Sequence, residues 1–82
     1  MPEPLIATRV GEVLAQVLDL SPSGIGPGLS AETTGAWTSL NHLMLISQLE
    51  SEFGVVFSNQ EVRELTSFTA IVAALERRTP GA

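Results

Sequence analysis

The sequence predicts a small all-α protein, a bundle of three to four helices with a long loop between helices 1 and 2. Apolar residues recur at helical spacing in separate segments, and residues typical of helix caps bound these segments. A chain of 82 residues allows one domain with a small core. We therefore expect a single domain over residues 1–82, ordered from about residue 4 to residue 78, with residues 79–82 as a tail.

The first helix is predicted over residues 4–19. Its apolar side chains repeat at three- and four-residue intervals and leave polar residues on the other side. These positions are Leu5, Ile6, Val10, Val13, Leu14, Val17 and Leu18. Pro4 suits the first turn, where its missing N–H is not needed, and Pro22 prevents continuation beyond Leu20.

Residues 20–38 are predicted to form a loop rich in glycine and proline. Because a connection of this length is uncommon in a compact domain, we expect apolar side chains to hold it against the core. The candidates are Ile25, Leu29 and Trp37.

The second helix is predicted from about Ser39 to Phe53, ending at Gly54, which suits the left-handed conformation after a helix. At about 100° per residue, one broad arc is apolar and should be buried. It contains Leu43, Leu45, Ile46, Leu49 and Phe53. The other side should face solvent or a partner and contains Leu40, Asn41, Met44, Ser47, Gln48 and Ser51.

The C-terminal part of the chain predicts an apolar connector and two further helices. Residues 55–57 form the connector, and the capping box that starts at Ser58 begins a short helix over about residues 59–64. Thr66 or Ser67 caps the last helix, which ends at residues 79–81. Its apolar stripe is Phe68, Ile71, Val72 and Leu75, and Arg77 and Arg78 complement the dipole in its last turn.

Composition excludes several classes of function. There is no cysteine and one histidine, which rules out a disulfide framework and a thiolate or histidine metal site. The net charge of −5, with no lysine, argues against nucleic-acid binding and against an anionic membrane surface. No apolar run approaches the roughly 20 residues of a membrane span. We expect a cytoplasmic protein, a monomer without a metal.

Ser39 is the candidate functional residue. Thr38 is the predicted N-cap, so the Ser39 hydroxyl lies beside unpaired backbone N–H groups and the positive end of the helix dipole. A phosphodiester could be stabilised there without a cationic side chain. A hydrolase or transferase that uses Ser39 directly is disfavoured, because its base would be His42, three residues along the same helix and poorly aimed. A helical interaction module with unmodified Ser39 stays open.

The arrangement resembles the acyl carrier protein family over nearly the whole chain. The resemblance lies in Trp37-Thr38-Ser39-Leu40, in the sequence Leu-Glu-Ser-Glu-Phe-Gly-Val at residues 49–55, in the short acidic helix, and in Leu-Thr-Ser-Phe at residues 65–68. It implies a non-catalytic carrier in which Ser39 bears 4′-phosphopantetheine, whose thiol carries an acyl thioester. The implied partners are a phosphopantetheinyl transferase, an acyl-loading enzyme and a downstream synthase or transferase.

The chain also departs from the pattern of that family. Most members have aspartate before the serine, where this chain has Thr38. Fatty-acid carriers also place acidic residues along the second helix, where this chain has neutral ones and only Glu50 near the edge. Because carboxylates steer association and select partners, we expect docking through neutral and apolar contacts, as in a dedicated carrier of polyketide or related natural-product synthesis. A peptidyl or aminoacyl carrier is the nearest alternative, although Gly35-Ala36-Trp37 lacks the usual Gly-Gly.

The residues expected to contact partners are Trp37, Thr38, Leu40, Asn41, Met44, Ser47, Glu50 and Glu61. Trp37 is interpreted either as a loop anchor or as a contact for a partner or the arm. His42 is either a packed, hydrogen-bonded residue or a contact for the arm. Leu40 and Met44 are either scattered surface residues or an apolar docking patch beside Ser39.

Overall fold

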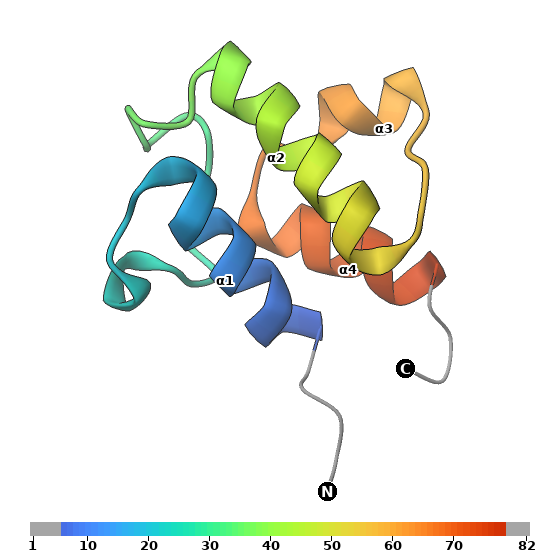
Figure 1. Ribbon diagram of the computed structural model, residues 1–82. Helices are drawn as coiled ribbons and strands as arrows, with labels where there is room; N and C mark the ends of the chain where they lie inside the picture. Colours follow the sequence, from blue (N-terminus) through green and yellow to red (C-terminus); the bar gives the residue numbers. More distant parts are fainter. Residues whose placement is uncertain (1–5, 79–82) are drawn as a thin grey trace, which may run out of the picture.

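The computed structural model describes residues 6–78 and contains four α-helices and one short 3₁₀ helix (Figure 1). The elements are α1 (Ile6–Leu18), η1 (Pro22–Gly24), α2 (Ser39–Phe53), α3 (Asn59–Glu64) and α4 (Phe68–Arg78). The described part of the chain contains no β-strand beyond a single isolated bridge between Ser30 and Ser67. The predicted all-α class is confirmed. The predictions for Pro4, Leu5 and the tail at residues 79–82 lie outside the described residues.

The core lies among α1, α2 and α4, with α1 packed against both of the other two. Its members include residues from all three helices and from the segments that join them. They are Val10, Val13, Leu14, Leu18, Trp37, Leu45, Ile46, Leu49, Phe57, Leu65, Ile71, Ala74 and Leu75. By contrast, α3 contributes no buried residue. It packs against the core through the partly buried Val62 and also makes polar contacts at its ends and at its backbone.

The first helix ends earlier than the position of Pro22 suggested. Asp19 adopts a left-handed conformation with φ of 55°, and the N–H of Leu20 donates to the carbonyl of Ala15 at 2.9 Å. This 6→1 bond closes a Schellman-type C-terminus, so α1 stops at Leu18. Pro22 instead opens η1, where its fixed φ suits a first helical position.

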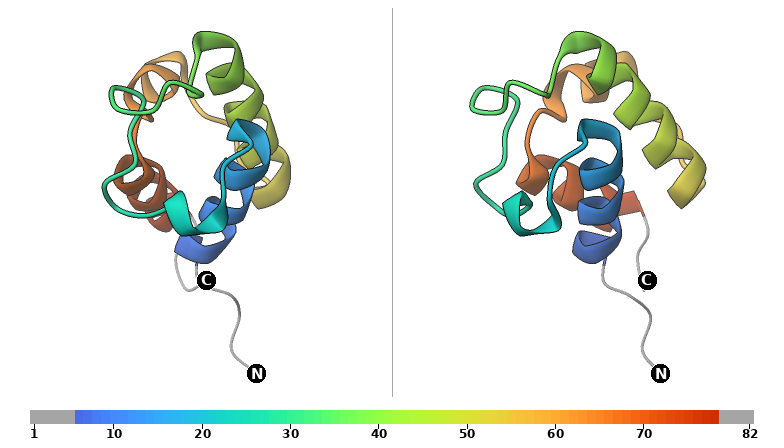
Figure 2. Two further views of the ribbon diagram at one scale, coloured as in Figure 1. Left: turned by 90° about the vertical axis from the view of Figure 1, so that its left-hand side faces the viewer. Right: turned by 60° about the vertical axis from the view of Figure 1, so that its left-hand side comes forward.

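The connection over residues 19–38 is fastened to the linker between α3 and α4. The N–H of Ala31 donates to the carbonyl of Thr66 at 2.9 Å, and the N–H of Phe68 donates to the carbonyl of Leu29 at 3.0 Å. The loop consequently runs along one side of the molecule past the start of α4 (Figure 2). As predicted, Ile25, Leu29 and Trp37 pack against the core. The long loop is therefore packed against the helices and hydrogen-bonded to the linker between α3 and α4.

The caps of the later helices follow the sequence closely. Gly54 has φ of 66° and ends α2, and the N–H of Val55 donates to the carbonyl of Glu50 at 3.2 Å. Ser58 and Glu61 form the predicted capping box of α3. Ser67, rather than Thr66, caps α4, because its hydroxyl accepts from the N–H of Ala70 at 3.1 Å. Residues 55–57 form no strand, as expected.

A cation from α1 fixes the far end of α2. Arg9 donates to both the carbonyl and the carboxylate of Glu52, at 2.9 and 3.1 Å, and its guanidinium lies 4.3 Å from the centre of the Phe53 ring. The pair is partly exposed, so its contribution to stability is small. The opposite end of α2, which begins at Ser39, carries no comparable ion pair in the described structure.

Candidate functional site

Ser39 is the first residue of α2, and its side chain is exposed. Thr38 caps the helix as predicted, since its hydroxyl accepts from the N–H of Asn41 at 3.1 Å. The carbonyl of Thr38 accepts from the N–H of His42 at 2.8 Å. Within residues 6–78, the N–H groups of Ser39 and Leu40 have no hydrogen-bond partner. Two free donors and the positive end of the helix dipole thus lie next to the Ser39 hydroxyl.

The segment that leads into Ser39 is tightly hydrogen-bonded despite Gly35. The N–H of Trp37 donates to the carbonyl of Thr34 at 3.0 Å. The carbonyl of Ala36 accepts two bonds, one from the N–H of Thr38 at 3.0 Å and one from the side-chain amide of Asn41 at 2.8 Å. Asn41 is half-buried and folds back over the helix start. The amide of Asn41 therefore holds the loop in place, and contact of this half-buried residue with a partner stays a prediction.

Trp37 and His42 connect the end of the loop to α3. Trp37 is 6% exposed, and its Nε1–H donates to His42 Nδ1 at 3.0 Å. Since Nδ1 accepts this bond, the hydrogen of the neutral imidazole lies on Nε2, which donates to the carbonyl of Val62 at 2.6 Å. These bonds confirm Trp37 as a loop anchor and His42 as a packed, hydrogen-bonded residue. Neither ring nitrogen of His42 is left to take a proton from Ser39.

A surface pocket of about 310 Å³ lies beside Ser39. It is bounded by the start of α2, the end of the loop and the linker between α3 and α4. The residues that line it are Ala31, Trp37, Thr38, Ser39, His42, Leu43 and Thr66. Because no aspartate, glutamate, lysine or arginine lines it, the pocket is suited to an apolar, uncharged group.

The N-terminal part of α2 presents an uncharged outer face made of Leu40, Leu43, Met44 and Ser47. Leu40 is 68% exposed and Met44 is 52% exposed, which confirms the prediction that both residues face outward. The prediction that Leu43 is buried is wrong, since 61% of this residue is exposed. At 100° per residue, Leu43 lies about 120° around the helix from the fully buried Leu49, at the edge of the predicted arc rather than at its centre. Leu43 therefore borders both the outer face and the pocket.

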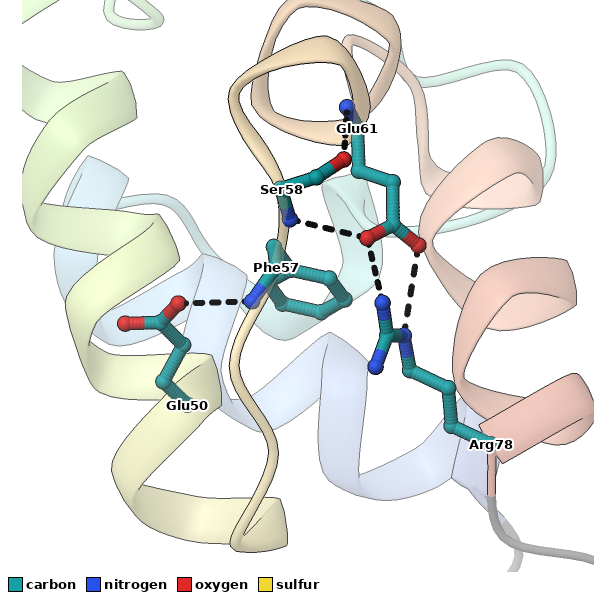
Figure 3. A network of polar contacts seen from close by, with 5 residues as sticks. All are labelled: Glu50, Phe57, Ser58, Glu61 and Arg78. Atoms are coloured by element: carbon teal, nitrogen blue, oxygen red, sulfur yellow. Dashed lines mark hydrogen bonds and ion pairs between the residues drawn. The ribbon is translucent and has the colours of Figure 1, made fainter.

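The two acidic residues expected to meet partners are already engaged within the chain (Figure 3). Glu50 is half-buried and accepts from the N–H of Phe57 at 2.8 Å. Glu61 accepts from the N–H of Ser58 at 2.9 Å and forms an ion pair with Arg78. The Ser58 backbone and, after it, the Arg78 guanidinium hold the pKa of Glu61 below the ordinary value of a glutamate. Both carboxylates therefore bind adjacent backbone N–H groups where the connector meets the start of α3.

Two residues of the site had no signal in the sequence pattern. Ala31 and Thr66 belong to separate loops, which backbone hydrogen bonds such as the one from Ala31 to Thr66 bring together. The other predicted residues lie as follows: Trp37 forms a wall of the pocket, Thr38 and Ser39 lie at its edge, and Ser47 is exposed farther along the outer face. Among residues 6–78, no helix has the length and apolar character needed to cross a membrane.

A comparison with models of known protein families gives no match, and a comparison with curated proteins gives none either.

Proposed function

We propose that this chain is an acyl carrier protein in which Ser39 bears 4′-phosphopantetheine through a phosphodiester. The observation that carries the proposal is the setting of Ser39: an exposed hydroxyl at the first position of α2, beside two unpaired backbone N–H groups and an apolar pocket. Backbone donors at a helix start stabilise phosphate oxygens without a cationic side chain. This suits a chain in which two of the four cations, Arg9 and Arg78, lie elsewhere in ion pairs.

The proposed role is that of a carrier without catalysis of its own. Both nitrogens of His42 are used in hydrogen bonds to Trp37 and Val62, so no oriented base is available to activate Ser39 as a nucleophile. The thiol at the end of the arm supplies the reactive atom, and the protein supplies attachment and recognition.

The partners follow from what must approach Ser39. A phosphopantetheinyl transferase attaches the arm, an acyl-loading enzyme charges it, and a synthase or transferase of polyketide or related natural-product synthesis accepts the cargo. Each meets the uncharged outer face of α2, because Leu40, Leu43 and Met44 are exposed on the same helix as Ser39 and residues 39–49 contain no formal charge. We expect these encounters to depend weakly on salt, since charge complementarity is the part of association that salt screens.

Intact-mass spectrometry after co-expression with phosphopantetheinyl transferases tests the proposal. The wild-type chain should gain the mass of one arm, and Ser39→Ala should gain nothing. Ser51→Ala is the matched control, because Ser51 is an exposed serine on the same helix outside the outer face and should leave modification unchanged. Thr38→Asp keeps a capping side chain and restores the residue most carriers have, so it should broaden the range of transferases that act. An unchanged wild-type mass with several transferases would favour an interaction module with unmodified Ser39.

A further inference from the structure

We propose that the pocket beside Ser39 binds the apolar, dimethyl-bearing segment of the phosphopantetheine arm, with Trp37 and Leu43 as its walls. This inference rests on the proposed function and names what the pocket is for. It concerns the part of the arm next to the phosphate and leaves the cargo outside the bundle.

The position of the pocket favours this occupant. Ser39 is itself a lining residue, so any group attached to its Oγ begins at the edge of the pocket. The first carbon segment after the phosphate of the arm bears two methyl groups, and it is followed by a hydroxyl and an amide. The apolar part of the arm therefore starts within reach of the pocket, whereas the thiol lies at its far end.

The lining matches the chemistry of that segment. Trp37 and Leu43 offer apolar surface, and the small side chain of Ala31 lines the pocket on the loop side. Thr38 and Thr66 belong to the same lining; the Thr66 hydroxyl can bond the amide of the arm, and the Thr38 hydroxyl, which accepts from Asn41, can still donate to the hydroxyl of the arm. Packing the two methyl groups there covers part of the exposed Leu43 side chain, which is favourable because apolar surface leaves water.

The volume limits how much of the arm can enter. The pocket has a volume of about 310 Å³ and opens onto the surface beside Ser39. That suffices for the dimethyl segment and its hydroxyl but not for the whole arm with an acyl chain. The thioester consequently stays accessible to enzymes while the base of the arm is held in one orientation.

Nuclear magnetic resonance of the modified protein tests the site directly. Trp37 is the only tryptophan, so its indole N–H gives a single resonance that reports on one wall of the pocket. Attaching the arm should shift this resonance, and the two methyl groups of the arm should give nuclear Overhauser contacts to Trp37 and Leu43. Intact mass, measured on the same sample, reports attachment independently.

Two variants and a control sharpen the test. Ala31→Leu fills the pocket from the loop side and should abolish the methyl contacts while the arm still attaches. Leu43→Ala removes an exposed wall with little risk to folding and should weaken the same contacts. Leu40→Ala is the control, because Leu40 is equally exposed on α2 but does not line the pocket. A modified protein whose methyl groups contact neither Trp37 nor Leu43 overturns the site alone, whereas a chain that gains no mass overturns the proposed function and the site with it.

Discussion

Replacing His42 by alanine removes both hydrogen bonds that connect the end of the long loop to α3. Trp37 then keeps its indole N–H in a position that is 6% exposed, without an acceptor, and the carbonyl of Val62 loses its donor. The substitution leaves the remaining contacts of α3 at its N-terminus in place, including the ion pair between Glu61 and Arg78. It therefore isolates the contribution of the imidazole.

The expected loss in the free energy of unfolding can be estimated from these two hydrogen bonds. A buried donor left without a partner costs about 1–3 kcal/mol. The carbonyl belongs to the half-buried Val62, which water can reach more easily, so the second lost bond adds about 1 kcal/mol or less. We expect a total of about 2–4 kcal/mol. A domain of 82 residues has roughly 4–12 kcal/mol of stability, so His42→Ala should still fold but should unfold at a clearly lower urea concentration.

Urea unfolding followed by far-ultraviolet circular dichroism measures this loss without relying on Trp37 fluorescence. Trp37→Phe removes the same donor from the other side, and the double variant completes a mutant cycle. Because the two side chains share one bond, their effects should differ from additivity by about 0.5–3 kcal/mol. Ser47→Ala, on the exposed face of α2, should change stability by less than about 0.5 kcal/mol. A loss below about 0.5 kcal/mol for His42→Ala, or additive single variants, would refute the reasoning.

The remaining predictions concern the core, the helix ends and pH. Leu49→Ala should cost about 2–5 kcal/mol because Leu49 is fully buried, whereas Leu43→Ala should cost less than about 1 kcal/mol because Leu43 is mostly exposed; urea unfolding measures both. Asp19→Gly should stabilise the fold by about 1–2 kcal/mol, because it relieves a positive φ and removes a negative charge from the negative end of α1. Gly54→Ala should destabilise the fold by about 1 kcal/mol, because it places a side chain at a position with positive φ. The lowered pKa of Glu61 means that its carboxylate contributes stability above the ordinary glutamate pKa of about 4.3, and that this contribution is lost as the pH falls through the lowered value. The stability difference between the wild type and Glu61→Gln should therefore shrink on acidification, as unfolding at a series of pH values measures.

Each of these predictions has an outcome that contradicts it. Equal losses for Leu43→Ala and Leu49→Ala would mean that Leu43 is buried after all. Asp19→Asn separates charge from backbone and should gain less than Asp19→Gly, so an equal gain would remove the backbone argument. A difference between the wild type and Glu61→Gln that grows on acidification would show that the carboxylate is not stabilised in the folded protein.

Local patterns in the sequence were enough to predict most of the secondary structure. Thr38, Ser58 and Gly54 act at the helix ends where the capping rules place them, because a cap depends on bonds to residues three or four positions away. The end of α1 was harder to place, because it depends on a left-handed aspartate that carries only a weak preference for that conformation.

The candidate site was predictable only in part. The position of Ser39 at the start of α2 followed from the cap and from the apolar periodicity behind it. The exposure of Leu43 did not follow, because a helical projection gives the direction of a side chain but not how far the neighbouring helices extend. The engagement of Glu50 and Glu61 within the chain also required the positions of Phe57 and Arg78.

The helices, their caps and the serine at a helix start could be predicted from the sequence, since all of these depend on residues near one another in the chain. The tertiary structure alone decided that the loop is fastened to the linker between α3 and α4, that His42 bonds Trp37 and Val62, and that Ala31 and Thr66 complete a pocket beside Ser39. These contacts join residues that are distant in the chain, and such pairs leave no periodic trace in one sequence. The position of the Ser39 hydroxyl at a helix start could therefore be predicted from the sequence, whereas the pocket beside it could not.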